Sequence, residues 1–456
     1  MTSTKPPGGT RDFLPEDVRR REHVVGVIRS VYERYGFEPL ETPAFENIET
    51  LLGKYGEEGN KLIFKILRRG EHEGTGDVDL ALRYDLTVPL ARVMAQYRSV
   101  LPRFFKRYQI QPVWRADRPA RGRFREFYQC DIDAIGSTSP VVEAEILAAV
   151  SDVLSTLGFD DFVIRLNHRR LLASLLRASG VPDSLHESAL VAIDKRDKIG
   201  ADGVRAELVT RGISDLAAAR CVSVFEGGGG EAAIRAKLLP GDNDGHATLS
   251  EILTIMELAT AAGAQSMVLD TSLARGLSYY TGAIMEVAVP DLAGSLGGGG
   301  RYDNLVGMFL GRDVPACGFS LGMERIIVVM TERGMFPPAV SGVAVDVMIA
   351  FMNDDLRADA LRLATECRKQ RLRVELFPEG GRKLDKALKY AGSRRVPFLA
   401  ILGEDERAKG EVAIRDLAAR HQESVSRAVA PGWMAARVER ARTDPGAAGA
   451  APGVQD

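Results

Sequence analysis

The stretch WRADRPARGRFREFYQ, residues 114–129, carries five arginines and four aromatic side chains within sixteen residues. The strand-like run FFKRYQIQPVWR overlaps its start and the strand-like run RFREFYQCDIDAIG overlaps its end. The loop between the two runs contains Pro119 and Gly122. Two such runs joined by a polar loop predict an antiparallel hairpin. Arginine offers a planar fork that matches phosphate oxygens and also stacks on rings. The pattern alone leaves two interpretations open, a nucleotide or polyphosphate site and a plain basic hairpin.

The composition is that of an ordinary globular protein with room for two or three domains in 456 residues. Its formal net charge is −2, so a nucleic-acid partner would have to meet a local basic surface. The four cysteines lie far apart with no CxxC pair, which disfavours a zinc site or a disulfide scaffold. The first residues have no apolar core, and no apolar run is long enough to span a bilayer. We therefore expect a soluble protein of the cytoplasm.

Residues 1–330 predict an α+β domain on an antiparallel sheet, because strand-like runs follow one another and helices flank them. Helical spacing covers 17–35, and FEPLETPAF after it, with two prolines, suits an edge or interface strand. Residues 168–258 change to short helical pieces and predict a small helical insertion. Its run EGGGGEA is expected to be a flexible loop, because no helix start or GK[ST] follows it.

Residues 331–342 have the prolines and glycines of a linker, and 343–430 alternate between strand and helix. This alternation predicts a small α/β domain with a largely parallel sheet. Residues 431–456 are expected to form a tail that could begin with a short helix after Pro431 and has a disordered end, DPGAAGAAPGVQD. Between Arg362 and Arg395 there are eleven basic residues and four acidic ones. This excess fits contact with an RNA backbone, although a solvated helix face would look the same.

Four short motifs have ordinary explanations when each is taken alone. LARGLSYYTG (273–282) could end a strand with a surface ion pair, and GSLGGGGRYD (294–303) predicts a tight turn rather than a dinucleotide fingerprint. In GFSLGMERI (318–326) the arginine could be a structural ion-pair partner. In ALRYDLTVPLAR (81–92), Asp85 and Thr87 could cap a helix that begins at Val88.

Taken together and in this order, the motifs resemble those of the class II aminoacyl-tRNA synthetases, and within them of the histidyl-tRNA synthetases. FEPLETPAFE resembles the first class II motif, which builds a dimer interface; VWRADRPARGRFREFYQCD resembles the ATP-holding second motif; GFSLGMERI resembles the third. GGTRDFLPED, LRYDLTVPLAR and LARGLSYYTG resemble histidine-specific segments. The resemblance runs from Gly8 to about Arg427. One departure is Ser278, where the family usually has an acid or an amide.

The resemblance implies a histidine–tRNA ligase that works through a histidyl-adenylate, with ATP as the ligand of the arginine-rich hairpin. It implies Arg115 and Arg275 as catalytic residues on either side of the α-phosphate. The implied histidine-binding residues are Asp85, Leu86, Thr87, Arg115, Gln129, Asp133, Arg275, Tyr279 and Tyr280. Of these, Asp133 and the two tyrosines are expected at the imidazole, and Asp85, Thr87 and Gln129 at the α-amino group. The implied ATP-binding residues are Arg115, Arg123, Glu126, Phe127 and Arg325.

The resemblance also implies Mg²⁺ bound through the ATP phosphates, with Glu126 nearby and no dedicated metal cage. The C-terminal domain is expected to bind the anticodon part of a histidine tRNA. A homodimer is expected, because the apolar stripe of 17–35 and the proline-bearing strand need covering. The alternative function is that of a non-catalytic, histidine-binding regulatory paralogue of ATP phosphoribosyltransferase. Such proteins typically lack the LARGLSYYTG-like segment and the C-terminal domain, and this chain has both.

Overall fold

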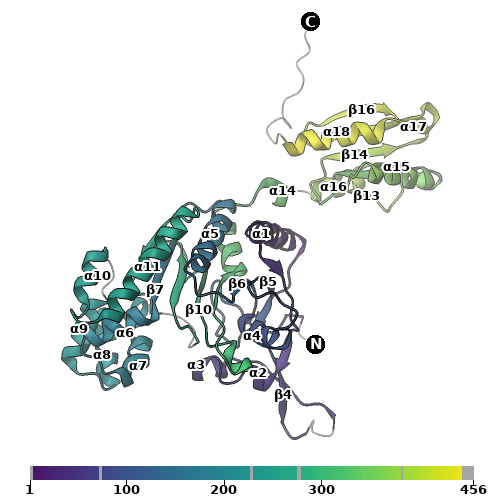
Figure 1. The fold of residues 1–456 in the computed structure, drawn as a ribbon. Coiled ribbons are helices and arrows are strands. Elements are labelled where there is room, and N and C mark those ends of the chain that lie inside the picture. Colours follow the sequence, from purple (N-terminus) through teal and green to yellow (C-terminus); the bar gives the residue numbers. More distant parts are fainter. Residues whose placement is uncertain are drawn as a thin grey trace. The chain divides into compact units, whose positions relative to one another are not determined.

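The structure, a computed structural model, describes residues 4–70, 74–225, 230–274, 279–341, 344–381 and 384–443. The chain divides into two compact units, residues 1–336 and 337–456 (Figure 1). Each unit has its own apolar core. Among the described helices, none has the length and apolar character needed to cross a membrane.

The first unit is built on an eight-stranded sheet with the order β1-β5-β6-β11-β10-β9-β7-β8. The edge pairs β1–β5 and β7–β8 are parallel, and the pairs between them are antiparallel. This confirms the expected α+β class with a mainly antiparallel sheet. The strands are β1 (Glu38–Pro39), β5 (Phe105–Trp114), β6 (Glu126–Ile135), β7 (Val163–His168), β8 (Met267–Leu269), β9 (Ala283–Ala288), β10 (Gly297–Arg301) and β11 (Ala316–Gly322).

The arginine-rich stretch forms the predicted hairpin. Strands β5 and β6 pair from Phe105 opposite Ile135 to Trp114 opposite Glu126, and the loop between them spans 115–125. Alternate side chains of a strand point to opposite faces of its sheet. On β6, Cys130, Ile132 and Ala134 therefore enter the main apolar core, and the residues between them face the other side. The hairpin is thus amphipathic, with one apolar face toward the core and one polar face on the other side.

Four helices pack on the apolar face of the sheet: α1 (Pro15–Arg34), α5 (Val141–Thr156), α11 (Asn243–Ala261) and α13 (Met323–Glu332) (Figure 1). The apolar stripe of α1 (Val24, Ile28, Val31 and Tyr32) is buried within this chain. The expectation that the stripe needs a second subunit to cover it is therefore wrong, since α5, α13 and the sheet already cover it.

A smaller sheet with the order β2-β4-β3 and a second apolar cluster lie on the other side of the hairpin. Its strands are β2 (Phe45–Asn47), β3 (Lys65–Leu67) and β4 (Val78–Leu82), all antiparallel. The helices here are α2 (Ile48–Leu51), α3 (Gly56–Lys61), α4 (Thr87–Gln96) and α12 (Gly307–Leu310). The chain leaves β4 directly into α4, which places the segment LRYDLTVPLAR beside the polar face of β5 and β6.

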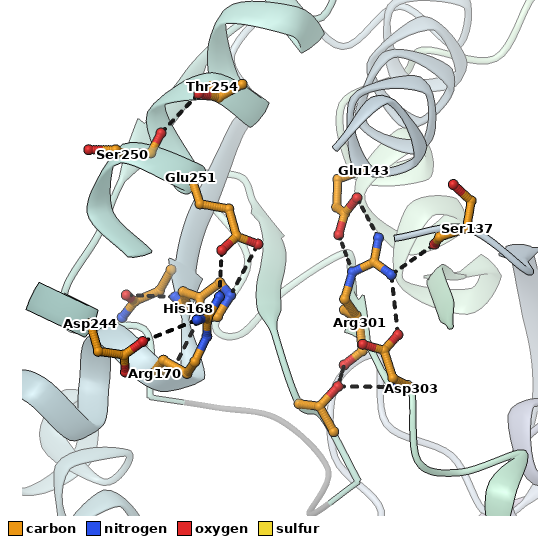
Figure 2. A network of polar contacts seen from close by, with 12 residues as sticks. Ser137, Glu143, His168, Arg170, Asp244, Ser250, Glu251, Thr254, Arg301 and Asp303 are labelled. Atoms are coloured by element: carbon orange, nitrogen blue, oxygen red, sulfur yellow. Dashed lines mark hydrogen bonds and ion pairs between the residues drawn. The ribbon is translucent and has the colours of Figure 1, made fainter. Parts of the chain in front are cut away.

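The glycine run of GSLGGGGRYD is strand β10 in the middle of the large sheet, so the predicted tight turn is wrong. A Cβ at Gly299 would lie 2.2 Å from the carbonyl oxygen of Gly318 on β11. The glycines therefore permit close approach of neighbouring strands, and their lack of side chains removed the alternation that marks a strand. Arg301 ends the strand and donates to both carboxylate oxygens of Glu143 on α5, at 2.6 and 2.8 Å (Figure 2).

The helical insertion lies between β7 and β8. Its helices are α6 (Arg169–Ala178), a 3₁₀ turn (Asp183–Leu185), α7 (His186–Ile193), α8 (Arg196–Thr210), α9 (Asp215–Val224), α10 (Glu231–Lys237) and α11. Figure 2 shows the polar contacts that join its first and last helices: Arg170 donates to Asp244 at 3.1 Å and to Glu251 at 2.5 Å. Most of the run EGGGGEA falls outside the described residues.

The second unit is a five-stranded sheet with the order β13-β12-β14-β15-β16. Strands β12 (Val347–Phe351), β13 (Val374–Leu376) and β14 (Phe398–Leu402) are parallel, as predicted. Strands β15 (Glu411–Asp416) and β16 (His421–Ser426) add an antiparallel hairpin that the sequence analysis did not predict. The helices are α14 (Pro338–Ser341), α15 (Arg357–Lys369), α16 (Asp385–Ser393), α17 (Glu404–Lys409) and α18 (Ala430–Thr443), with a 3₁₀ turn at Asp354–Leu356.

Two expected domain boundaries fall on helices. Helix α14 lies within the linker expected at 331–342, and α18 begins where the tail was expected. In α18, Ala430, Met434 and Val438 are buried in the core of the second unit. This helix is therefore part of the unit's fold, because its apolar face packs against α15 and the sheet. Residues 444–456 lie outside the described residues.

Candidate active site

A cavity of about 720 Å³ lies over strands β6, β9, β10 and β11 of the first unit. A cavity of this size suits a small organic ligand or a nucleotide. Nine of the thirteen predicted site residues line it: Asp85, Thr87, Arg115, Arg123, Gln129, Asp133, Tyr279, Tyr280 and Arg325. The predicted residues Leu86, Glu126 and Phe127 are not part of its lining. Arg275 lies outside the described residues, as does Ser278.

The polar face of β6 presents three acceptor side chains to this cavity at alternate positions: Gln129, Asp131 and Asp133. All three are buried. Strand β5 places Gln111, Gln109 and Arg107 opposite them on one side, and β11 places Gly322, Ser320 and Gly318 on the other. The period of two along each strand thus gathers polar residues from three strands on one face, where glycine leaves space for the ligand.

Asp133 is held by two buried partners. Its Oδ2 lies 2.9 Å from Nη2 of Arg107, and its Oδ1 accepts the hydroxyl of Tyr302. Burial raises the pKa of Asp133, and the Arg107 guanidinium opposes the rise. A Cβ at Gly318 would lie 1.9 Å from Asp133 Oδ1, so glycine is required beside this carboxylate. The side chain is therefore fixed in position before any ligand arrives.

Asp85 caps a helix and faces the cavity at the same time. Its Oδ1 accepts the backbone N–H of Val88 at 3.1 Å and the hydroxyl of Tyr55 at 3.0 Å, and its Oδ2 accepts the hydroxyl of Tyr279 at 3.4 Å. Burial raises the pKa of this carboxyl. The capping role expected for Asp85 and the predicted binding role are thus compatible, because the cap aims the carboxylate into the cavity.

Leu86 contributes its backbone rather than its side chain. The side chain is buried, and the carbonyl oxygen accepts Nη2 of Arg107 at 3.1 Å. Thr87 is the first residue of α4, and its side chain hydrogen-bonds with Tyr279. The rings of Tyr279 and Tyr280 meet edge to face with centroids 5.1 Å apart. Burial raises the pKa of both phenols, so both can donate hydrogen bonds at neutral pH.

Arginines form the other end of the cavity. Arg115 donates from Nε to the carbonyl oxygen of Tyr84 at 3.0 Å, and its guanidinium carbon lies 5.2 Å from the ring centroid of Phe127. Arg123 is exposed in the hairpin loop and lines the cavity. Arg325, near the start of α13, donates from Nε to the carbonyl oxygen of Gly122 at 3.4 Å. The second and third motifs therefore meet at this end.

Two further arginines of the hairpin serve the fold. Arg121 forms an ion pair with Glu332 of α13, and Arg125 donates to the carbonyl oxygens of Gly8 and Asp117, both at 3.2 Å. The spacing of arginines and aromatics could not separate these residues from Arg115 and Arg123, because all of them alternate in one loop. Contacts with distant segments decide their roles.

Sequence reasoning missed several residues of the site. Asp131 and Ser320 line the cavity, Arg107 bridges the carboxylates, and Tyr302 holds Asp133. The alternation of QCDID on the predicted strand could have revealed Asp131, since residues 129, 131 and 133 share a face. The insertion also reaches the cavity, through Asp194 and Lys198. No signal in the sequence marked those two residues.

Within the described residues, no group of three or more His, Cys, Asp or Glu side chains has the arrangement of a metal site. Mg²⁺ is commonly held by one or two carboxylates together with substrate phosphates. Glu286 lines the cavity from β9 and is a carboxylate that fits this mode, whereas Glu126, at the start of β6, is exposed and lies outside the lining.

Comparison with known proteins gives consistent matches over both units. A family model described as histidyl-tRNA synthetase matches residues 9–326, and a model described as an anticodon binding domain matches residues 346–437. A curated histidine–tRNA ligase of Gloeobacter violaceus is 41% identical over 94% of this chain and 98% of its own length.

Solved structures show the same fold. The crystal structure of histidyl-tRNA synthetase from a Nostoc species covers 96% of this chain and all of its own, with a TM-score of 0.79 and 29% identity. A Bacillus halodurans structure, titled an ATP phosphoribosyltransferase regulatory subunit/histidyl-tRNA synthetase, covers 88% of this chain with a TM-score of 0.72 and 21% identity. At that identity the second match shows the fold alone.

Proposed function

The chain belongs to the histidyl-tRNA synthetase family, and from this premise we propose which of its residues carry out the reaction. It ligates L-histidine to its tRNA through a histidyl-adenylate, consuming ATP and releasing AMP and pyrophosphate. The regulatory-paralogue alternative is not favoured, because the curated relatives that match nearly the whole chain are ligases. The observation that carries the residue assignment is one cavity lined both by Asp85, Asp131 and Asp133, which we call its acidic end, and by Arg115, Arg123 and Arg325, which we call its basic end.

The acidic end of the cavity takes the amino acid. Asp85, Thr87 and Gln129 bind the α-ammonium group, and Asp133, Tyr279 and Tyr280 bind the imidazole. A cationic ammonium group next to a buried carboxylate relieves the cost of that burial. Phenol hydroxyls and carboxylates that stay unpaired without the correct ring reject other side chains strongly.

The basic end takes ATP. Arg115 contacts the histidine carboxylate and the α-phosphate, Arg275 acts from the opposite side of that phosphate, and Arg123 and Arg325 hold the outer phosphates. Phe127 stacks on the adenine, with Arg325 on its other face. The histidine carboxylate attacks the α-phosphorus in line and pyrophosphate leaves. Charge spreads over phosphoryl oxygens, so positioning and fixed positive charge supply most of the catalysis.

Mg²⁺ enters with ATP and neutralises the phosphate charge when bound. Glu126 is its proposed protein neighbour, and the remaining ligands are phosphate oxygens and water.

The test of this assignment is ATP–pyrophosphate exchange with each of the twenty amino acids. Exchange should depend on histidine alone. Exchange with proline or threonine but not histidine would assign a different amino acid to the acidic end.

A matched pair of variants tests Arg275: Arg275→Ala should lower single-turnover adenylate formation by about 10²- to 10⁴-fold, and histidine affinity much less. Near-normal adenylation by this variant would remove Arg275 from the catalytic residues. Arg121→Ala, which breaks an ion pair away from the cavity, is the control.

The second unit matches an anticodon-binding domain, and we propose that its basic residues contact the tRNA backbone. Several of the basic residues between Arg362 and Arg395 are already paired, among them Arg373 with Asp346 and Arg394 with Glu375. Lys369 and Lys389 are exposed and are the better candidates. A chain ended at Phe336 should keep histidine-dependent exchange and lose most tRNA charging, with a flatter salt dependence of tRNA binding. Charging at the full rate and with the full salt slope would exclude this role.

We also propose a homodimer in the cytoplasm. The exposed edge strand β1 and the exposed Phe45 of β2, both in the first motif, support an interface there. The four cysteines are free and buried, which suits a reducing compartment. Light scattering should give twice the chain mass of 49.6 kDa. An active monomer would exclude the dimer.

A further inference from the structure

Asp131 is a buried carboxylate in the cavity that the assignments above leave without a role. It lies between Gln129 and Asp133 on the same face of β6, lines the cavity and is 2% exposed. Its strand neighbours across the sheet are Gln109 on β5 and Ser320 on β11. A carboxylate in this position costs folding free energy unless it is paired.

The described residues contact only part of the Asp131 carboxyl group. The Ser320 hydroxyl hydrogen-bonds with its carboxyl group, and Arg107 Nη2 lies 3.9 Å from its Oδ2. Its other oxygen, Oδ1, is buried and has no hydrogen-bond partner among the described residues. Asp133 Oδ2 also has no hydrogen-bond partner there, but it forms an ion pair with Arg107 at 2.9 Å, and Asp133 Oδ1 accepts the hydroxyl of Tyr302. Asp131 Oδ1 is thus a buried acceptor in the cavity to which none of the described residues donates a hydrogen bond.

Among the described residues, the two carboxylates of β6 share one neighbouring cation. Arg107 is the cation next to both Asp131 and Asp133, so the three ionised side chains together carry one negative charge. Asp85 adds a further carboxylate nearby, and Tyr280 faces the pair as a neutral phenol. Burial raises the pKa of Asp131 to about 7, and Arg107 opposes the rise. A ligand that brings a positive charge to this place would be stabilised.

Spacing along the strand also favours Asp131. Consecutive residues of a strand rise about 3.3 Å, so Gln129 and Asp131 are about 7 Å apart and Gln129 and Asp133 about 13 Å. The α-nitrogen of histidine is separated from its far ring nitrogen by five bonds, roughly 6 Å. With the ammonium group near Gln129, the ring therefore reaches Asp131 before it reaches Asp133.

We propose that Asp131 Oδ1 accepts one ring N–H of the bound histidine while Asp133 serves the other nitrogen, so that the site binds the ring with a proton on both nitrogens. Asp131 is then a specificity-determining residue for the histidine-activation step. The proton comes from the carboxyl group of Asp131 or from solvent, and the bound ring is an imidazolium beside two carboxylates and Arg107. This inference rests on the proposed histidine-binding role of Asp85 and Asp133.

A direct test uses ring-labelled [¹⁵N]histidine bound to the full-length wild-type protein at about pH 8, well above the ordinary imidazole pKa of about 6.5. Both ring nitrogens should give the NMR shifts of protonated nitrogen. One unprotonated nitrogen in the bound ring would overturn the proposal, whatever any variant does.

A second test compares histidine with triazolylalanine, whose ring replaces one C–H by nitrogen and is far less basic. In ATP–pyrophosphate exchange, Asp131→Asn should lower kcat/KM for histidine by about 10- to 100-fold, the range for losing a charged hydrogen-bond partner. For the analogue the loss should stay within about threefold, because its ring brings no charge to stabilise. Discrimination between the two substrates should therefore fall by about tenfold.

The same substitution at the other carboxylates separates the possible failures. Asp85→Asn should weaken both substrates equally, since they share the ammonium group. If Asp133→Asn lowers discrimination and Asp131→Asn does not, the role of Asp131 is wrong and the histidine site stands. If neither variant changes discrimination, the ring does not lie against β6 and the assignment of the acidic end is wrong.

Discussion

The two ends of the cavity differ in charge, burial and backbone. At the acidic end, where we propose that histidine binds (the histidine end), Asp131 and Asp133 lie on β6 and Asp85 lies just before α4. Arg107 of β5 and Tyr302 after β10 contact Asp133, and Tyr55 before α3 donates to Asp85. At the basic end, where we propose that the phosphates bind (the phosphate end), the arginines come from a loop and a helix start, and Arg123 is exposed. A strand-built end can reject wrong rings through fixed, unpaired acceptors. A loop-built end can follow a polyphosphate whose charge moves during the reaction.

We propose that Arg115 contacts both the histidine carboxylate and the α-phosphate, so its loss should have the largest effect. Its guanidinium carbon lies 4.3 Å from the ring centroid of Tyr84 and 5.2 Å from that of Phe127, and its Nε donates a hydrogen bond to the carbonyl oxygen of Tyr84. Arg115→Ala should lower single-turnover adenylate formation by about 10²- to 10⁴-fold, because it removes a charge at the reacting phosphate. Arg118→Ala, an exposed arginine of the same loop outside the cavity lining, should be close to wild type. Equal losses in both variants would mean that the loop's total charge matters rather than this position.

The difference between the two ends also explains which residues of the site could be predicted from the sequence and which could not. Much of the phosphate end comes from one continuous stretch, the sixteen residues 114–129, whose arginines and aromatic residues can be recognised from the sequence. The histidine end is assembled across strands: Arg107 and Asp133 meet because β5 and β6 pair in one register, and Ser320 and Asp131 because β11 pairs next to them. No local pattern encodes a register. Strand β10 escaped prediction for another reason, since a run of glycines has no alternation of side chains.

The histidine end should fail when its packing is disturbed by one methyl group. Gly318→Ala places a Cβ 1.9 Å from Asp133 Oδ1 and 2.9 Å from the carbonyl oxygen of Ile132, so the carboxylate must move. The KM for histidine should rise by about 10- to 100-fold, the scale of a charged hydrogen bond, while the KM for ATP changes little. Exchange kinetics measure both constants. The control is Gly26→Ala on α1, where a Cβ meets no atom within 4 Å.

The phosphate end should respond to the same kind of change more weakly. Gly122 has φ +68°, and a Cβ there would lie 3.3 Å from Cγ of Arg325. Gly122→Ala should raise the KM for ATP by about three- to tenfold, because a left-handed alanine costs roughly 1–2 kcal/mol and the loop leaves its binding geometry. The KM for histidine should stay unchanged.

Gly36→Ala is the matched control for that loop. Gly36 has φ +75° in open space, so it carries the same backbone cost away from the cavity. It should lower thermal stability without moving either KM. A rise in the KM for histidine in Gly122→Ala would show that the two ends are mechanically coupled and do not respond separately.

The smallest effect concerns stability in the empty protein, and it again separates the ends. Burial raises the pKa of Asp131 from 3.8 to about 7. Between about pH 4 and pH 7 the folded state therefore keeps a proton that the unfolded chain has released, and wild-type stability falls as the pH rises through this window. Above the folded-state pKa both states are ionised and the dependence stops. Asp131→Asn lacks this dependence, so the melting temperature of the variant relative to that of the wild type should rise between about pH 5 and about pH 8.

For Arg123→Gln at the phosphate end, the difference in melting temperature from the wild type should not change with pH, since a guanidinium does not titrate in this range. Saturating histidine should reduce the gain of Asp131→Asn at about pH 8, because the ligand stabilises the wild-type carboxylate more than the amide. Melting curves with and without histidine at the two pH values measure both effects. If the melting temperatures of Asp131→Asn and the wild type differed by the same amount at both pH values, the pKa of Asp131 would not be raised in the empty protein. The carboxylates of the histidine end would then be compensated without the ligand, as the arginines of the phosphate end are.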